Sequence, residues 1–316
     1  MKSGVKIMKK EVFSVGIDLG NGFTNYLSQR TGEGQRFATK VKQVAEFPFS
    51  ENKRSEIHRV ELDGKKFIVG EGVTVEIKDV KQRINSRDYR VALLTAIARS
   101  LPRPGYAEVD VCVGLPIARL QMFADELEEI IRGWDRVELI VDNERYEIVI
   151  NHVQVFPEGA LSVIRDLEGR VLTIDMGSGT VDCISFIDGE PHETFTVHTS
   201  MNDIYTNVAD RLNVELGMSL TTDMIEDYIG KEVVSYDRKD VDISTHFEDI
   251  EAGVKAIYSQ ISSKFAPMAQ YERVILLGGA SILAFDYWNK LINGVELEDN
   301  AQYVNAKIFQ LMAESN

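Results

Sequence analysis

The chain has 316 residues, of which 44% are hydrophobic and 27% are charged, and this composition excludes a mainly disordered protein. It has 50 acidic and 35 basic residues, a formal net charge of −15, which disfavours tight, direct binding to nucleic acid because phosphate contacts need a basic surface. The two cysteines, Cys112 and Cys183, are too few for a disulfide framework or a multi-cysteine zinc site.

In chain order, the hydrophobic pattern alternates between strands and helices, which is typical of an α/β protein. Apolar or alternating runs predict strands at 12–19, 23–28, 109–114, 137–140, 146–150, 171–176, 180–186, 194–198 and 274–277, and a hairpin around Asp63-Gly64. Helical spacing predicts helices at 89–101, 118–132, 157–167, 202–216, 222–229, 247–265 and 301–312.

None of the apolar runs has the form of a secretion signal or a membrane span. The stretch at 12–17 is too short for a signal peptide, and the run at 274–285 is interrupted by two glycines and a serine. We therefore expect a cytoplasmic protein that does not contact a membrane.

One segment of the sequence occurs twice. Residues 17–25 read IDLGNGFTN and residues 174–182 read IDMGSGTVD, so Asp18 corresponds to Asp175, 157 positions later. Each copy is a buried strand that ends in Asp, a turn with two glycines, and a second strand. An offset of almost half the chain predicts two related halves that share this hairpin.

The repeated hairpins have the composition of a phosphate-binding site. Turns rich in Gly, Ser and Thr expose backbone N–H groups and hydroxyls that bind phosphate oxygens, and an Asp at each strand end can hold a hydrated Mg²⁺. A third turn, Gly278-Gly279-Ala280-Ser281, ends an apolar strand and begins a helix, so its backbone can closely approach a nucleoside or an α-phosphate. The sequence has no P-loop, dinucleotide-binding fingerprint or nucleophile elbow.

In this order, the segments resemble those of the superfamily that contains actin, the sugar kinases and the heat-shock chaperone ATPases. Residues 18–25 and 175–182 resemble its two phosphate loops, 274–281 its adenosine segment, and VGLPIARL with FPEGALSVI its first connecting region. Within the superfamily, GIDLGNGFTN, VELDGKKFIVGEG, VCVGLP and YVNAKIFQLM resemble the ParM/StbA-type plasmid-segregating bacterial actins. The sequence departs from the usual pattern at Phe23 and Ser281, and the first loop has no lysine.

The resemblance implies an actin-like α/β fold, in which two related, ribonuclease H-like domains flank a central nucleotide cleft. We expect domain I at 1–168, with a small subdomain inserted at about 31–88. Domain II is expected at 169–290, with a small subdomain at about 217–246, and residues 291–316 are expected to return to domain I.

The resemblance also implies a role for each motif residue. Asp18 and Asp175 would hold Mg²⁺, and Asp175 and Glu158 would orient the attacking water, a contribution of about 10²–10⁴ in rate. The alternative for Glu158 is an acid that only stabilises a helix N-terminus. The residues expected to bind the nucleotide are Asn21, Gly22, Phe23, Thr24, Asn25, Gly177, Ser178, Gly179, Thr180, Asp182, Gly278, Gly279 and Ser281. Asn207 and Arg211 would either reach the ribose or base, or belong to a solvated helix face.

By this resemblance, the protein would polymerise into filaments with Mg-ATP or Mg-GTP and disassemble after hydrolysis to ADP or GDP. The filaments would move plasmid DNA through a small DNA-binding adaptor, which agrees with the acidic chain. A small-molecule kinase or a non-polymerising regulatory ATPase of the same superfamily is the alternative, since a shared fold does not settle function. The short segment between 216 and 247 counts against a kinase, which needs an acceptor pocket. The sequence does not distinguish ATP from GTP.

Overall fold

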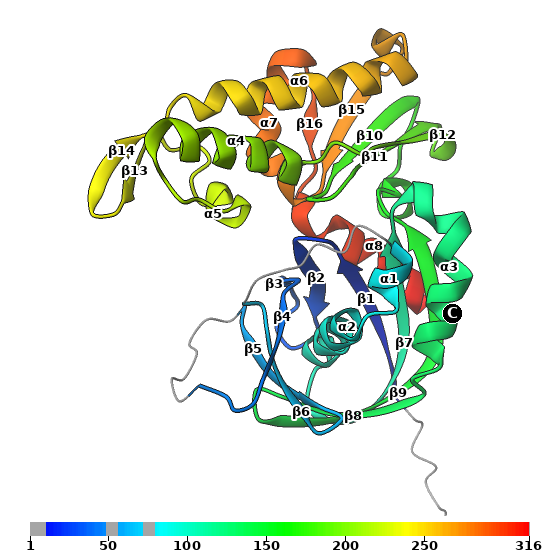
Figure 1. Ribbon diagram of the computed structural model, residues 1–316. Helices are drawn as coiled ribbons and strands as arrows, with labels where there is room; N and C mark the ends of the chain where they lie inside the picture. Colours follow the sequence, from blue (N-terminus) through cyan, green and yellow to red (C-terminus); the bar gives the residue numbers. More distant parts are fainter. Residues whose placement is uncertain (1–10, 49–55, 72–79, 316) are drawn as a thin grey trace, which may run out of the picture.

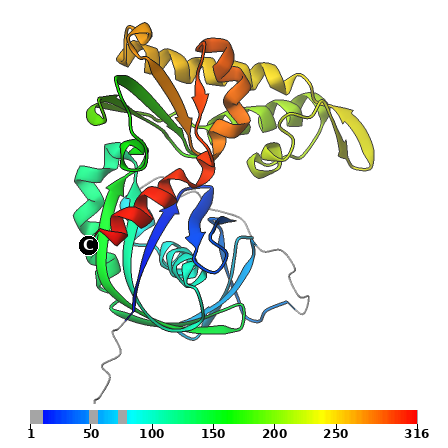
Figure 2. The ribbon, with the colours of Figure 1, turned by 180° about the vertical axis from the view of Figure 1, so that it is seen from behind.

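The computed structural model describes residues 11–48, 56–71 and 80–315. These residues form two main β-sheets that lie one above the other, each with its own helices (Figure 1). The chain completes the first sheet before it begins the second, and its last helix then returns to the first sheet (Figure 2).

The first sheet has nine strands in the order β3-β2-β1-β7-β9-β8-β5-β6-β4 and curls around helix α2 (Figure 1). Its strands are β1 (Val12–Leu19), β2 (Phe23–Ser28), β3 (Glu33–Ala38), β4 (Val41–Val44), β5 (His58–Leu62), β6 (Lys65–Val69), β7 (Gly105–Leu115), β8 (Arg136–Val141) and β9 (Glu144–Pro157). Helix α2 (Arg87–Ser100) contacts β1, β2, β4, β5 and β6 and is buried along most of its length, as its largely apolar sequence requires.

Two further helices of the first half lie near one another. Helix α3 (Ile117–Arg132) packs against β9, and the short helix α1 (Val80–Ile84) contacts α2 and α3. The Ser86 side chain caps α2 by accepting a hydrogen bond from the Tyr89 N–H at 3.1 Å. This arrangement fixes the position of α1 beside the end of β1, where the candidate site begins.

The second sheet has five strands in the order β12-β11-β10-β15-β16. These are β10 (Arg170–Met176), β11 (Val181–Ile187), β12 (Glu190–Val197), β15 (Arg273–Leu277) and β16 (Glu296–Leu297). On one face, Leu172, Ile174 and Met176 of β10 join the core formed with helices α4 (Met201–Leu216), α6 (His246–Lys264) and α7 (Gly279–Leu291). Because side chains alternate along a strand, Asp175 faces the opposite side, with Val171.

A separate two-stranded hairpin, β13 (Val233–Tyr236) with β14 (Lys239–Asp242), follows the short helix α5 (Thr222–Glu226). Figure 1 shows this hairpin projecting from the end of the second half. This hairpin and strands β3 and β4 differ from the sequence-based expectation, because their short, mixed runs have weak periodicity.

Helix α8 (Val304–Glu314) lies directly on β1 and β7 of the first sheet (Figure 2). A Cβ at Gly16 of β1 would overlap the backbone of Ala306 and Gln310, so only glycine allows this close approach. Phe309 and Ile308 of α8 share a buried cluster with Ile275 of the second sheet, among other apolar residues. The last helix therefore packs against both halves.

The prediction of a helix at 157–167 is wrong, because the structure has no α-helix there. Strand β9 continues to Pro157 because it stays paired with β7, where Leu115 is the partner of Pro157. Gly159 then has a φ of 79°, which ends any regular structure, and only a 3₁₀ turn at Leu161–Val163 follows. The helix predicted at 222–229 is shorter than expected and ends at Glu226.

The two cysteines are buried and free, and burial raises the pKa of both thiols. They therefore act as small apolar core residues. Among the residues that the structure describes, no helix combines the length and the apolar character needed to cross a membrane.

Candidate functional site

The repeated sequence segment forms the same hairpin twice. In the β1–β2 hairpin Asp18 is the partner of Asn25, and in the β10–β11 hairpin Asp175 is the partner of Asp182. Each turn is closed by one bond of 3.0 Å, from the Gly20 N–H to the Phe23 carbonyl and from the Gly177 N–H to the Thr180 carbonyl. Each first strand also pairs in parallel with another strand of its sheet, β7 or β15. The sequence repeat is therefore a repeat of structure.

The two hairpin turns touch each other. The Gly22 N–H donates a hydrogen bond of 2.8 Å to the Ser178 hydroxyl. A Cβ at Gly179 would overlap the side-chain amide nitrogen of Asn21, so this glycine permits the close approach of the first turn. Backbone N–H groups and hydroxyls from both halves thus converge on one place.

Four carboxylates surround this place. Asp175 and Asp182 are 5% and 2% exposed, and Asp18 and Glu158 are half-buried. Burial raises the pKa of Asp18 to about 6 and the pKa of Asp175 to about 7. Burial also raises the pKa of Asp182, although hydrogen bonds from Thr196 and Thr180 oppose the shift. A cluster of this kind is common at functional sites.

Glu158 belongs to this cluster and does not cap a helix. It lies directly after β9, where its N–H donates to the Leu115 carbonyl at 3.1 Å. Burial raises the pKa of Glu158 well above its ordinary value, and the charges of Asp18, Asp182 and Asp175 raise it further. The alternative role at a helix N-terminus is excluded, because the predicted helix does not form.

Arg83 of α1 is a functional candidate that the sequence analysis missed. Its guanidinium donates to the Leu19 carbonyl at 2.5 Å, and its charge lowers the pKa of both Asp18 and Glu158 against the effect of burial. No local motif marks Arg83, since it lies 65 positions after Asp18 and approaches it only through the fold.

The third turn lies against the second hairpin. Gly278 has a φ of 80°, and a Cβ there would overlap a carboxylate oxygen of Asp175 and come close to the Met176 carbonyl. Gly279 begins α7, as the sequence predicts. The Ser281 side chain is fully buried and donates to the Leu277 carbonyl, so its hydroxyl is used inside the helix.

The other predicted residues of the first hairpin are held by their neighbours. The Arg36 guanidinium lies over the Phe23 ring, 4.3 Å from its centre. The buried Thr24 hydroxyl is 2.9 Å from that of Thr39. The Asn25 amide donates to Asp18 at 2.9 Å, so Asn25 orients that carboxylate.

Asn207 and Arg211 lie away from these contacts. Both are on α4, where Asn207 is exposed. The Arg211 guanidinium bonds to Glu215 at 3.0 Å and to Asp249 at 2.8 Å, which links α4 to α6. These partners favour the solvated-face interpretation for Arg211.

Two amides at the start of the last helix, Gln302 of the 3₁₀ turn Ala301–Tyr303 and Asn305 of α8, contact the site and were not assigned to it from the sequence. Gln302 donates to the Asn25 carbonyl oxygen at 2.8 Å, and Asn305 donates to Asp175 at 2.7 Å. Only Asn305 lies in the segment YVNAKIFQLM, which was quoted for its resemblance alone, and amides on a helix carry no spacing signal.

The donor set fits a hydrated Mg²⁺. In the described part of the chain, no group of three or more His, Cys, Asp or Glu side chains is arranged to hold a metal. Mg²⁺ keeps several waters and takes only one or two carboxylates, which Asp18 and Asp175 could supply. The four carboxylates have raised pKa values, and the charge of Arg83 opposes the shift only at Asp18 and Glu158, so additional positive charge would stabilise the ionised forms of all four.

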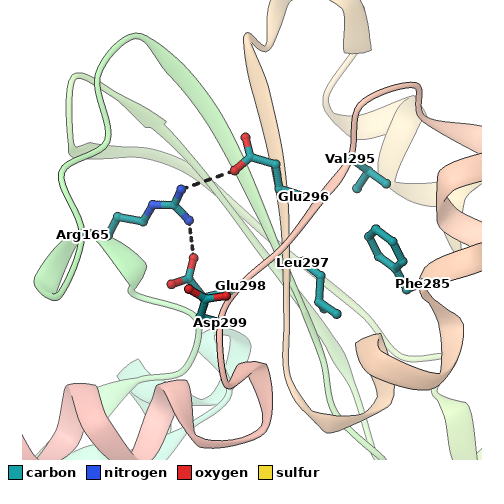
Figure 3. Close-up of a pocket in the computed structure, with 7 residues that line it drawn as sticks. All are labelled: Arg165, Phe285, Val295, Glu296, Leu297, Glu298 and Asp299. Atoms are coloured by element: carbon teal, nitrogen blue, oxygen red, sulfur yellow. Dashed lines mark hydrogen bonds and ion pairs between the residues drawn. The ribbon is translucent and has the colours of Figure 1, made fainter.

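A separate cavity of about 670 Å³ lies beside the two chain segments that connect the halves (Figure 3). Arg165, in the connection from β9 to β10, pairs there with Glu296 of β16 and with Glu298, which follows β16. The other lining residues are Phe285, Val295, Leu297 and Asp299. None of the predicted site residues lines this cavity, so the hairpins and not the cavity define the candidate site.

Models of known protein families match both halves of the chain. The family described as "Actin like proteins N terminal domain" matches residues 16–160, and "Archaeal actin homologue MreB-like, C-terminal" matches residues 173–286. Each half of the chain is therefore similar to actin-like proteins. No curated protein sequence matches it significantly.

Solved structures match over nearly the whole chain at low identity. The archaeal actin homologue Ta0583 is 19% identical, with a TM-score of 0.76 over 96% of this chain and 99% of its own. A 15-stranded ParM filament from Clostridium botulinum is 17% identical, with a TM-score of 0.81 over 98% and 100%. The Alp12 filament is 20% identical, with a TM-score of 0.67 over 95% and 98%. These matches confirm the predicted actin-like α/β fold.

Proposed function

We propose that this protein binds Mg-ATP or Mg-GTP between its two hairpins, polymerises into filaments in that state, and hydrolyses the nucleotide to disassemble. The observation that carries the proposal is the convergence of two in-phase Asp hairpins, which meet through Gly22 and Ser178, on a cluster of four carboxylates. Phosphoryl transfer to water needs positioning and charge neutralisation more than covalent chemistry, and this site offers both.

Each group in the site has a role in this proposal. The Gly22 N–H and the Ser178 hydroxyl, which now bond to each other, would each turn to a phosphate oxygen. Asp18 and Asp175 would hold Mg²⁺ through its waters, and the ion supplies charge neutralisation at the β- and γ-phosphates when bound. Glu158, whose pKa is raised by burial and by the neighbouring carboxylates, would orient the attacking water together with Asp175.

The backbone of Gly278 and Gly279 would lie against the nucleoside or α-phosphate. In the same proposal, residues 1–168 and 169–290 are two bodies that close on the nucleotide, and 291–316 connects them. The position of α8, which packs against β1 and also contacts Ile275 of β15 in a buried cluster, supports such a connection.

The proposal extends to filaments and to DNA cargo. It is supported by the likeness to a ParM filament and to the Alp12 filament, and a structure of Ta0583 contains ADP. Plasmid DNA would be segregated through a DNA-binding adaptor, since a net charge of −15 disfavours direct contact with DNA.

Light scattering and phosphate release, recorded together after adding Mg-ATP or Mg-GTP, test the proposal. We expect scattering to rise with one of these nucleotides, and to fall as phosphate is released. Phosphate release without scattering would overturn the filament part, and the absence of both would overturn the nucleotidase part. Adaptor-dependent cargo is tested separately, by whether filaments recruit DNA only when a DNA-binding partner is added.

A further inference from the structure

The junction between the 3₁₀ turn Ala301–Tyr303 and α8 carries two amide side chains, Gln302 and Asn305, three positions apart. Residues at this spacing lie on the same side of a helix. Each amide contacts a different hairpin, so a single short segment reaches both halves of the chain: Asn305 bonds directly to Asp175, and Gln302 reaches Asp18 through Asn25.

Gln302 reaches the first hairpin and the third turn. Its amide nitrogen donates to the Asn25 carbonyl oxygen at 2.8 Å, and the Asn25 amide in turn donates to Asp18 at 2.9 Å. The Gln302 carbonyl oxygen accepts a bond of 3.1 Å from Arg36. A Cβ at Gly279 would overlap the Gln302 amide, so this side chain also lies directly against the third turn. The orientation of the Asp18 carboxylate therefore depends on Gln302 through Asn25.

Asn305 reaches the second hairpin and the segment that carries Glu158. Its side chain is 8% exposed, and its amide nitrogen donates to Asp175 at 2.7 Å. Its carbonyl oxygen accepts from the Gly159 N–H at 3.0 Å. Because a carboxylate only accepts and an N–H only donates, these partners fix which way the amide points. One side chain thus sets the separation between Asp175 and the backbone next to Glu158.

Anchoring of α8 does not require these amides. The helix is already held by the close approach of Gly16 and by the buried side chains of Val304, Ile308 and Phe309. Its polar positions could be filled by apolar residues if packing were their only purpose. Both amides instead make hydrogen bonds that end on the carboxylates of the candidate site.

We propose that Gln302 and Asn305 are positioning residues of the nucleotide site: Gln302 holds Asp18 for the metal, and Asn305 holds Asp175 and the Glu158 segment for the attacking water. This inference rests on the proposed function, because it assigns these amides a role in nucleotide binding and hydrolysis. The two amides have different roles: loss of Gln302 would loosen Asp18 and chiefly weaken metal-dependent binding. Loss of Asn305 would leave Asp18 to hold the metal, loosen Asp175 and the Glu158 segment together, and chiefly slow turnover.

Four variants test this division, with Gln310→Ala as the control. Gln310 is an amide on the same helix, and it bonds only to Glu314 on an exposed face among the contacts seen in the described residues. Each variant is measured for nucleotide Kd with Mg²⁺, nucleotide Kd with EDTA, the single-turnover rate of phosphate release, and Tm. The isosteric variants Asn305→Asp and Gln302→Glu keep the volume and remove the amide donor, so they remain informative where an alanine variant does not fold.

For Asn305→Ala, we expect phosphate release to slow about tenfold or more while Kd with Mg²⁺ changes less than about threefold, and for Asn305→Asp a larger loss of rate. For Gln302→Ala and Gln302→Glu, we expect Kd with Mg²⁺ to rise about tenfold while Kd with EDTA is unchanged. Gln310→Ala should match the wild type in all four measurements.

Unchanged rates and Kd values in the Gln302 and Asn305 variants, with or without a lower Tm, would overturn the inference and leave the amides a structural role. An equal loss in Kd with and without Mg²⁺ for Gln302→Ala would also overturn it. These outcomes differ from failure of the proposed function, in which the wild-type protein itself binds no nucleotide.

Discussion

The Gly22 N–H donates a hydrogen bond of 2.8 Å to the hydroxyl of Ser178, 156 positions further along the chain. This bond joins the turns of the two repeated hairpins and brings the two halves of the chain into contact at their phosphate-binding groups. Both partners are groups that bind phosphate well, an N–H donor and a hydroxyl. A nucleotide would therefore exchange this direct contact for contacts made through its phosphates.

Replacing Glu158 with alanine should preserve Mg-nucleotide binding and slow phosphate release by about 10²–10⁴, because Glu158 orients the water and does not hold the nucleotide. Assemblies of this variant should last longer. Single-turnover phosphate release and equilibrium Kd measure the two effects separately. The control is Glu168→Ala, because Glu168 is an exposed acid in the same connection between β9 and β10. Turnover at the wild-type rate in Glu158→Ala would remove Glu158 from the mechanism.

Replacing Asp18 with alanine should weaken nucleotide binding only when Mg²⁺ is present. The carboxylate lies at the end of β1 and is oriented by Asn25, as a metal-holding group requires. Isothermal titration with Mg²⁺ and with EDTA separates the two conditions. Equal affinity of the wild type and the variant in Mg²⁺ would contradict the metal role.

Replacing Gly278 with alanine should destabilise the protein by about 1–3 kcal/mol more than replacing Gly217. Both glycines have positive φ values, 80° and 64°, so both substitutions strain the backbone. Only at Gly278 would the added Cβ overlap Asp175, since nothing lies within 4 Å at Gly217. Denaturant unfolding of the two variants measures the difference in their free energies of unfolding. Equal losses of stability would show that the third turn is not in close contact with Asp175.

The pH dependence of stability should change when Asp175 is replaced with asparagine. Burial raises the pKa of Asp175 from 3.8 to about 7, so the folded state favours its protonated form. Its stabilising contribution is complete below about pH 4 and is lost as the pH rises to about 7. Without Mg²⁺ and nucleotide, the variant should therefore gain about 1–3 kcal/mol over the wild type between pH 4 and pH 8.

The control for this experiment is Asp242→Asn. A hydrogen bond from the Ser244 N–H holds the pKa of this carboxyl below its ordinary value. It is therefore ionised throughout the range between pH 5 and pH 8, and its removal should give a constant difference there. Parallel pH profiles for the wild type and Asp175→Asn would contradict the burial cost assigned to Asp175.

The sequence predicted the parts of the site that lie within local motifs. The pairing of Asp18 with Asn25 and of Asp175 with Asp182 follows from the repeat, because a two-glycine turn fixes the register of the strands beside it. The segment 157–167 was wrongly predicted as a helix, since the pairing of Pro157 with Leu115 and the positive φ of Gly159 are not visible in local spacing.

Arg83, Gln302 and Asn305 were missed for a related reason. Arg83 and Asn305 lie beside the carboxylates, and Gln302 reaches Asn25, only because α1, the 3₁₀ turn and α8 pack beside the ends of β1 and β10. This packing depends on residues such as Gly16 that are far away in the sequence. A side chain that acts through tertiary packing leaves no periodic signal of its own.

Amide hydrogen exchange, compared with and without Mg-ATP or Mg-GTP, tests most directly whether the nucleotide binds between the hairpins. A nucleotide that contacts both hairpins and the third turn should slow exchange together in residues 18–25, 175–182 and 278–281. Exposed strands such as β13 and β14 should exchange as before. Protection of only one hairpin, or of neither, at saturating nucleotide would contradict a site built from both.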